Sequence, residues 1–369
     1  MMCKCVHKTI RFVLANLCIY CTSFVCAQDS TVAEPKFTAR LFLDVYYSYD
    51  FSQPLQKEKA PFLYSYNRHN EVNVNLALAS IQYKQQRVRA AVGIMTGTYS
   101  RYNLASEPAL LQHVYEANAG IRLFKQKNLW LDAGILPSHI GFESAIGKDC
   151  QTLTRSMLAE NSPYYETGAR VSYTSANRKW YAATLLLNGW QRIVPVSGSK
   201  SISLGTQVTW SPSGKFSFNW SSFSGNTKPD SIRRQRYFQN VYARWAPVPQ
   251  WQFIAGFDFG LEQTRPSVNR YHSWFAPVLQ ISYCKQPWAF AARAEYFNDP
   301  AGMIMPRVEQ LPFRMYGYSA NIDRHLGSWG LWRMEWRMFQ HYTPYFLYSN
   351  QRKKMNHLLT CSFLFDLKR

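Results

Sequence analysis

Acidic residues are scarce in this chain. Its 369 residues include 22 Asp and Glu against 42 Lys and Arg, which gives a formal net charge of +20 at pH 7. Such an excess is typical of nucleic-acid-binding proteins, but in those proteins the basic residues are clustered, whereas here they are scattered along the chain. We therefore expect no nucleic-acid partner.

Long apolar runs are missing after residue 27. No later stretch approaches the roughly 18 apolar residues that a membrane-spanning helix requires. The first 27 residues have the pattern of a secretory signal peptide, because Lys4, Lys8 and Arg11 precede an apolar stretch at 12–25. The sequence therefore predicts an exported protein with a signal peptide at 1–27 and one mature domain at 28–369.

Cysteine is almost absent from the mature chain. Only Cys150, Cys284 and Cys361 remain there, and their spacing fits neither a disulfide framework nor a metal site. A lipid anchor on Cys26 fits poorly, because Val25 stands where such anchors have a small residue. We expect no bound metal and no cofactor.

Catalytic motifs are missing as well. The chain has no nucleophile elbow and no pair of histidines at helical spacing, so we expect no enzymatic activity. A hydrolase embedded in a barrel wall is the alternative, because serines and histidines are available for nucleophilic chemistry. The histidines considered for this role are His113, His139, His272, His325, His341 and His357.

Apolar and polar residues alternate along most of the chain, and 16% of the residues are aromatic. At 37–51, Phe37 and Leu41 lie on one face and Arg40 and Asp44 on the other, which is the period of a strand with one lipid-facing and one water-facing side. Stretches of this kind predict strands at 37–51, 71–84, 87–94, 112–124, 129–136, 164–174, 179–189, 202–211, 215–223, 236–245, 250–262, 272–283, 287–297, 315–325, 330–340 and 355–366.

The connections between these predicted strands alternate in length. Long segments such as 52–70 and 137–163 follow the odd strands, and short ones such as 125–128 and 212–214 follow the even strands. This alternation is typical of outer-membrane barrels, in which both chain ends lie on the periplasmic side. The sequence predicts an all-β fold, a transmembrane antiparallel up-and-down β-barrel of about 16 strands, within a range of about 14 to 18.

A barrel of this size is expected to contain a channel. Barrels of about eight strands are filled by their own side chains, whereas sixteen to eighteen strands leave an aqueous passage. The connection at 137–163 is too long for a turn, and it would be the third external loop. By analogy with sixteen-stranded porins of other bacteria, we expect it to fold at least partly into the lumen, with a short helical turn near 153–158.

Two motifs enclose this long connection. The run AGILPSHIGFESAIGKD begins at Ala133, and the run LTRSMLAENSPYYETGARVSY begins at Leu153. Together they resemble the OmpL-like β-barrel porins of Bacteroidota, in which a Ser-His-Ile-Gly segment and a Thr-Arg-Ser…Glu-Asn-Ser-Pro-Tyr-Tyr-Glu-Thr-Gly segment lie mid-chain. The resemblance implies an outer-membrane pore. One departure is that Lys368 and Arg369 follow the last strand in place of a final aromatic residue.

The polar faces of the predicted strands carry charged residues that would line the pore. Most are expected to be solvated or paired with one another, and the remainder could set ion selectivity. The candidates are Arg40, Asp44, Arg89, Glu116, Arg122, Asp132, Glu166, Arg170, Asp258, Glu262, Arg293, Glu295, Arg333 and Glu335.

Charged residues of the long connection allow two roles with equal weight. They could line a constriction, or they could pin the loop to the barrel wall through ion pairs. These residues are Glu143, Lys148, Asp149, Arg155 and Glu160. Tryptophans near the predicted strand ends are expected at the membrane interfaces; they are Trp180, Trp210, Trp245, Trp251, Trp274, Trp288, Trp332 and Trp336.

The predicted function is that of an outer-membrane porin, a water-filled channel for passive diffusion of small solutes or ions. The competing hypothesis is a structural or adhesion barrel with a closed lumen. Expected partners are outer-membrane lipid, lipopolysaccharide and the barrel-assembly machinery.

The excess of basic residues predicts a preference for anions. The alternative is that these groups bind the phosphates of lipopolysaccharide and leave the lumen unselective. Basic residues assigned to the external loops or their edges are Lys57, Lys59, Arg233, Arg234, Arg236, Arg352, Lys353 and Lys354.

Overall fold

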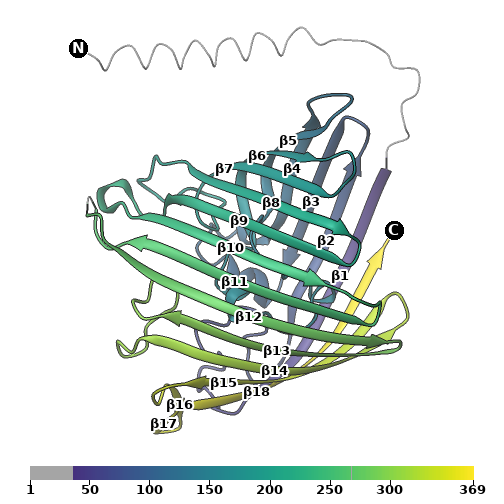
Figure 1. Cartoon of the computed structure of the whole chain (residues 1–369). Coiled ribbons are helices and arrows are strands. Elements are labelled where there is room, and N and C mark those ends of the chain that lie inside the picture. The colour runs from purple at the N-terminus through teal and green to yellow at the C-terminus, as the bar shows by residue number, and fades with distance from the viewer. Residues whose placement is uncertain (1–35, 267) are drawn as a thin grey trace, which may run out of the picture. The chain divides into compact units, whose positions relative to one another are not determined.

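The structure is a computed structural model that describes residues 36–266 and 268–369. Sixteen of its strands are antiparallel and close into one barrel (Figure 1). The predicted fold class and strand number are therefore confirmed. The predicted signal peptide at 1–27 lies outside the described residues.

The barrel strands follow one another around the ring in chain order, and the last one closes against the first. They are β1 (Lys36–Asp50), β2 (Val72–Lys84), β3 (Val88–Thr96), β4 (Val114–Arg122), β5 (Asn128–Pro137), β6 (Tyr165–Thr174), β7 (Trp180–Leu187), β8 (Ser203–Ser213), β9 (Phe216–Asn226), β10 (Gln235–Trp245), β11 (Trp251–Gln263), β12 (Tyr271–Lys285), β13 (Trp288–Asp299), β14 (Phe313–Leu326), β15 (Gly330–His341) and β18 (Met355–Lys368).

The ends of the barrel sequence lie on one rim. Lys36 at the start of β1 pairs with Lys84, which precedes the short β2–β3 turn. The backbone N–H of Arg369 donates to the carbonyl oxygen of Ala39, 3.0 Å away, so the C-terminus reaches the same rim. The short turns therefore share the periplasmic rim with both ends, as the alternating connection lengths predicted.

The strands have the two faces that the alternation predicted. In β1, Asp44 and Ser48 are fully buried toward the lumen, whereas Leu41 is 59% exposed on the outer face. Outward apolar side chains suit lipid, and every barrel strand has a neighbour on both sides, so the described barrel leaves no unpaired strand edge in the membrane.

Several features of the loops were not predicted. The β3–β4 connection contains α2 (Thr98–Asn103) and the 3₁₀ turn η2 (Leu111–His113), and the last external connection contains a small hairpin of β16 (Phe346–Tyr348) and β17 (Gln351–Lys353). Two further 3₁₀ turns are η3 (Gly147–Asp149) and η4 (Asp230–Ile232). Among the described residues, no helix is long and apolar enough to cross a membrane.

Two expectations about side-chain placement were wrong. Trp274 is only 1% exposed and packs inside the barrel, so it does not belong to an interfacial belt. The inner face is also less polar than expected, since a large apolar cluster occupies the lumen. Its wall members include Leu185, Leu187, Phe223, Phe238, Val278, Phe297, Phe313 and Phe339. Strand alternation did not reveal this cluster, because loops fold inward and give these residues apolar partners.

Candidate functional site

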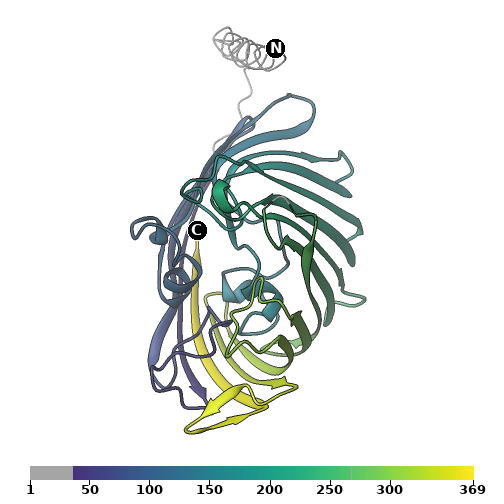
Figure 2. The same cartoon turned by 90° about the vertical axis from the view of Figure 1, so that its left-hand side faces the viewer.

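The lumen of the barrel contains the connection between β5 and β6, residues 138–164, which we call the lumen loop. Figure 2 looks into the ring of strands and shows the helical part of this loop, α3 (Met157–Glu160), inside it. Met157 and Leu158 are almost completely buried in the apolar cluster of the lumen. The predicted helical turn therefore forms, although it begins a few residues later than the expected 153–158.

The lumen loop begins at a buried histidine clamp. The His139 ring lies between Oε2 of Glu166, 2.7 Å from Nδ1, and the carbonyl oxygen of Ser222, 2.8 Å from Nε2. Because both partners accept hydrogen bonds, both ring nitrogens donate and the ring carries a positive charge. Burial disfavours this charge, but the Glu166 carboxylate and the Ser222 carbonyl outweigh it and raise the pKa of His139.

A glycine in the wall makes room for this clamp. A Cβ on Gly205 of β8 would lie 2.7 Å from the nearest carbon of the His139 ring. That distance is shorter than a normal contact, so the ring can lie flat against the wall only over a residue without a side chain. His139 comes from the Ser-His-Ile-Gly motif and Glu166 from the Glu-Thr-Gly motif. The clamp therefore joins the two motifs.

Arg155 folds the loop onto itself. Its guanidinium donates to the carbonyl oxygens of Ser144, Leu153 and Ala145 at 2.6, 2.7 and 3.2 Å. The residue is 1% exposed. Its donors are thus directed at the loop backbone, where they satisfy carbonyls that would otherwise be buried without partners.

Ser156 and Glu143 stabilise the start of α3. Ser156 is the N-cap of this helix, and its hydroxyl accepts from the backbone N–H of Ala159. Glu143 in turn accepts from the backbone N–H of Ser156, 2.9 Å away. Glu143 is therefore engaged within the loop and does not project freely into an aqueous space.

A charged network of the wall holds the middle of the lumen loop. Arg293 pairs with Glu335 at 2.9 Å, and Arg337 pairs with Glu295. Glu335 also accepts from the backbone N–H of Thr154 at 2.5 Å, and Arg293 donates to the Thr154 carbonyl oxygen at 2.7 Å. The charges of the wall thus have opposite charges or loop backbone groups as partners, which lowers the penalty for burying them. Nε of Arg293 and Nε of Arg337 are buried without a hydrogen-bond partner.

Glu160 connects the lumen loop to the first external loop, residues 51–71. Its carboxylate accepts from the backbone N–H groups of Tyr64 and Ser65 at 3.0 and 3.1 Å. Burial raises the pKa of Glu160 to about 7, and the two N–H donors oppose that shift. Because Phe62 of the same external loop packs against Phe313 and Phe339 of the wall, the two loops fill the lumen together.

Lys148 and Asp149 lie toward the periplasmic side of the loop. Lys148 pairs with Asp366 of β18 at 3.0 Å, and Asp149 lies 3.7 Å from Arg40 of β1. Ion pairs thus attach this end of the loop to the wall. All five predicted loop residues therefore have polar contacts, either ion pairs with the wall or hydrogen bonds within the loops.

The predicted pore-lining residues are on the inward faces, and most have partners. Arg40 pairs with Asp366, Arg89 and Arg170 pair with Asp132, and Arg333 pairs with Asp323. Asp44 accepts from Tyr66 and Ser362, Asp258 from Asn240, and Glu262 from Arg236. Glu116 has a long contact of 3.4 Å with Gln82, and Arg122 donates to the Lys127 carbonyl oxygen.

Sequence reasoning missed several inward charges. Arg337 and Asp323 belong to the wall network, yet they were absent from the candidates. A consistent period of two would have found Arg337, because it follows Arg333 and Glu335 on the same face of β15. Arg236 was assigned to the external loops or their edges, and it is the second residue of β10, where it is 6% exposed and lies between the rings of Trp190 and Trp274. Lys59 lies in the first external loop, as assigned, but it is 7% exposed, and burial lowers its pKa to about 8.

A small polar cavity of about 230 Å³ remains between the lumen loop and the wall formed by β1, β2, β4 and β18. It is lined by Arg40 and Lys368, which are basic, and by Glu116 and Asp149, which are acidic. Ser80 and Gln82 contribute neutral polar groups. Charges of both signs therefore face the same space.

These features define the class of protein. A closed barrel of sixteen antiparallel strands, with short turns and both ends on one rim and a long loop inside the lumen, is an outer-membrane porin fold. More particularly, the chain belongs to the family described as "Putative beta-barrel porin-2, OmpL-like", which matches residues 36–367. Its location is therefore the outer membrane.

Solved porins share this fold at low sequence identity. The anion-selective porin from Comamonas acidovorans is 8% identical, with a TM-score of 0.59, and the match covers 90% of this chain and 100% of that one. OmpT of Vibrio cholerae in its trimer form is 8% identical, with a TM-score of 0.57 and coverage of 90% and 99%. Pseudomonas putida OprB, in a high-pH structure, is 8% identical, with a TM-score of 0.52 and coverage of 90% and 94%. No curated protein sequence matches the chain.

Proposed function

We propose that this porin is a narrow channel for passive diffusion of small solutes or ions. The observation that carries the proposal is the polar cavity beside the lumen loop, because charged and neutral polar groups line it while apolar packing fills much of the remaining lumen. The passage would run along the wall formed by β1, β2, β4 and β18. Its size would exclude large solutes.

Single-channel recording tests this proposal. Deleting residues 143–155 removes the segment between the clamp and α3, and conductance in a planar bilayer should rise. A control is deletion of residues 264–266, which lie in the β11–β12 connection rather than in the lumen loop. Equal conductance of the deletion variant and the parent would contradict a passage controlled by the lumen loop.

We further propose that the channel prefers anions. The excess of basic residues favours a positive potential at the rims. The cavity itself contains charges of both signs, so the rims would carry most of the preference. Reversal potential in a potassium chloride gradient measures it, and the same measurement on an Arg233→Gln/Arg234→Gln variant locates its origin. A potassium preference in the parent would refute this part of the proposal.

The second candidate is a structural barrel with a closed lumen. The packing of Phe62, Met157 and Leu158 in one apolar cluster favours it, because such a plug is costly to open. An absence of current under conditions where the loop deletion conducts would support this candidate. Lipopolysaccharide at the external basic residues and the barrel-assembly machinery at the last strand are the partners we propose for either function.

A further inference from the structure

The outer wall has an apolar groove where β18, β1, β2 and β3 lie side by side. Its floor is formed by Ala77 and Ala79 of β2, which pair with Leu43 and Leu41 of β1. Leu41 is 59% exposed, so this row faces the lipid. Because two small residues stand beside larger ones, the described strands leave a hollow of about 820 Å³ unfilled.

The groove slopes across the membrane. At one end it is lined by Thr96, the last residue of β3, which lies at the external end of that strand. At the other end it is lined by Leu367 of β18, near the periplasmic rim. Strands of membrane barrels are tilted by about 35–45°, so a row that crosses four of them also descends. The groove therefore follows the general direction of lipid acyl chains.

A polar cavity of about 650 Å³ adjoins the external end of the groove. The cavity and the groove share Thr96 and His113, and both residues are exposed. The cavity is bordered by α2 and η2, and Figure 2 shows these helical turns, in blue, on the outer side of the ring of strands. The polar cavity and the apolar groove thus open to the same face of the wall.

Two contacts fix the position of α2 and η2. A Cβ on Gly97, which has a φ of 128°, would lie 2.5 Å from the carbonyl oxygen of Asn75, so only glycine lets α2 begin against β2. Nδ1 of His113 donates to the carbonyl oxygen of Met95, 3.1 Å away, and ties η2 to β3. The polar cavity therefore has a defined place at the end of the groove.

Arg101 is the uncompensated cation of the cavity. The other arginine of the lining, Arg68, pairs with Glu71 at 2.9 Å and with Glu58 at 3.2 Å. The Arg101 guanidinium lies over the ring of Tyr102, 5.4 Å from its centroid, and forms no ion pair among the described residues. One cation is thus available to a phosphate group from outside the chain.

The rest of the lining is rich in neutral polar groups. Asn73, Ser100 and Gln112 each carry donors and acceptors of hydrogen bonds. Sugar hydroxyls also donate and accept, whereas a bare phosphate only accepts. A single free cation among mixed donors and acceptors therefore suits a phosphorylated sugar, and the adjoining groove suits an acyl chain attached to it.

We propose that the cavity and the groove together bind lipid A, the acylated and phosphorylated sugar end of lipopolysaccharide. A sugar phosphate contacts Arg101, and an acyl chain lies over Ala77 and Ala79. The site rests on the proposed partner lipopolysaccharide, but it uses other residues than the basic ones assigned to that partner above. It does not depend on whether the barrel conducts.

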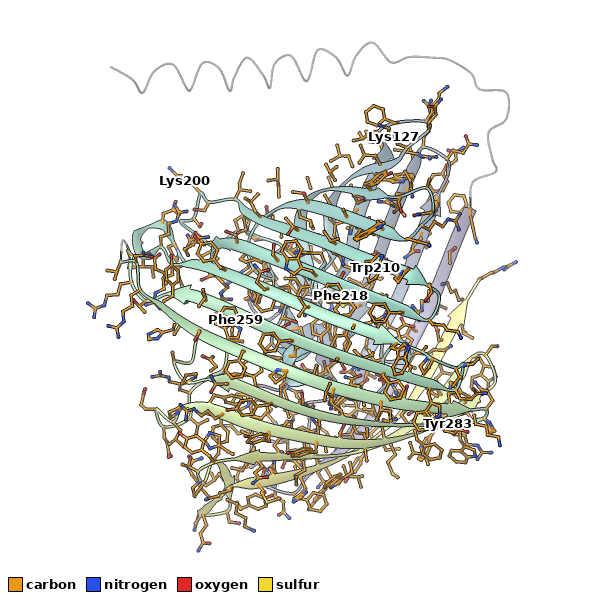
Figure 3. The ribbon with its side chains drawn as sticks, viewed as in Figure 1. Lys127, Lys200, Trp210, Phe218, Phe259 and Tyr283 are labelled. Carbon is orange, nitrogen blue, oxygen red and sulfur yellow. The ribbon has the colours of Figure 1, made fainter. Side chains whose placement is uncertain are left out.

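Native mass spectrometry of the full mature protein in detergent tests the headgroup contact. Bisphosphorylated lipid A should bind to Arg101→Gln about fivefold more weakly than to the parent, because a basic residue near the membrane surface contributes about 1 kcal/mol. The matched control is Lys200→Gln, which removes the same charge from an exposed residue of the β7–β8 connection. Figure 3 shows Lys200 at the end of the barrel opposite to Lys127 and Tyr283. The control should bind lipid A like the parent.

A second variant tests the groove. Ala77→Phe/Ala79→Phe fills the hollow, and it should weaken lipid A binding at least about fivefold, because overpacking costs about 1–3 kcal/mol. Packing is the relevant term, since the chain stays in an apolar medium whether or not it is bound. The matched control is Ala255→Phe/Ala294→Phe, which makes the same change in another hollow of the outer wall, formed by β10 to β14. It should bind lipid A like the parent.

The outcomes separate the site from the partner. Parental lipid A binding in both test variants would overturn this site and leave lipopolysaccharide as a partner, whereas no binding to the parent would contradict both. Phosphatidylglycerol binding as tightly as lipid A would overturn the sugar contact. If the groove variant changed only the ratio of oligomer to monomer, the groove would be an interface between copies of this chain. Heat-modifiable electrophoretic mobility verifies that each variant forms the barrel.

Discussion

Replacing His139 by Ala is the most direct test of how the lumen loop is held. The change removes both ring donors, so the Glu166 carboxylate, which is fully buried, loses its ring donor, and the Ser222 carbonyl loses its own. Leaving one member of a buried charge pair without its partner costs about 3–5 kcal/mol. The equilibrium ratio between the loop bound in the lumen and the loop displaced from it should therefore fall by a factor of roughly 10² to 4 × 10³.

The barrel itself should survive this replacement. His139 lies outside the strands, and the strand hydrogen bonds do not use its side chain. Single-channel recording should show higher or more variable conductance, while heat-modifiable mobility stays that of a folded barrel. His325→Ala at the periplasmic end of β14 is the control, because its side chain takes no part in the clamp.

The clamp also predicts a pH dependence. The folded-state pKa of His139 lies above its ordinary value of 6.5. Its contribution to loop seating is therefore complete below pH 6.5 and is lost as the pH rises through the folded-state pKa. The parent should become more conductive above neutral pH, and His139→Ala should lack that component. If His139→Ala kept the conductance and the pH dependence of the parent, the His139 clamp would not hold the lumen loop. In the double variant His139→Ala/Glu166→Ala no orphan carboxylate remains, so much of the effect should reverse.

Three further replacements test neighbouring parts of the lumen. Burial raises the pKa of Glu160 to about 7, so the contact between the first external loop and the lumen loop should lose about 3 kcal/mol as the pH rises from 4.5 to above 7. Glu160→Gln should abolish this pH dependence, which amide exchange at Tyr64 would measure. Gly205→Ala should displace the His139 ring and reproduce part of the His139→Ala conductance change. Unchanged conductance would show that β8 moves to make room for the added methyl group and that the ring stays in place. Tyr66→Phe removes a 2.5 Å hydrogen bond to buried Asp44 and should lower stability to denaturant by about 1–3 kcal/mol, whereas no loss would mean that Asp44 finds another donor.

The strands were predictable from the sequence for a simple reason. Each strand of a membrane barrel has lipid on one side, so residues such as Leu41 and Ile121 must be apolar and their neighbours can be polar. Because this requirement acts on each strand separately, apolar residues recur at every second position of the sequence. The alternation of long and short connections then indicated the direction of the chain, and the first described residue, Lys36, and the last, Arg369, lie on the rim that it indicated.

The loop motifs were visible in the sequence, but their contacts were not. Glu160 meets Tyr64 and Ser65, which lie in another external loop, and Arg293 and Glu335 meet Thr154 across the lumen. The sequence around each residue does not indicate such partners, because they come together only when the barrel closes. The five charged loop residues allowed a constriction or an anchoring role, and the choice between the two stays a prediction for the conductance measurements.

The sequence by itself determined the barrel class, the strand number and the orientation of the chain, because lipid on one side and hydrogen-bonded neighbours on both sides act on every strand separately. Only the tertiary structure decided what fills the lumen. Inward residues such as Phe223, Phe339 and Trp274 are apolar because folded loops cover them, and the His139–Glu166 pair is charged and buried because a carbonyl of β9 completes it. Such contacts join strands that are distant in the chain, so they exist only once the ring is closed.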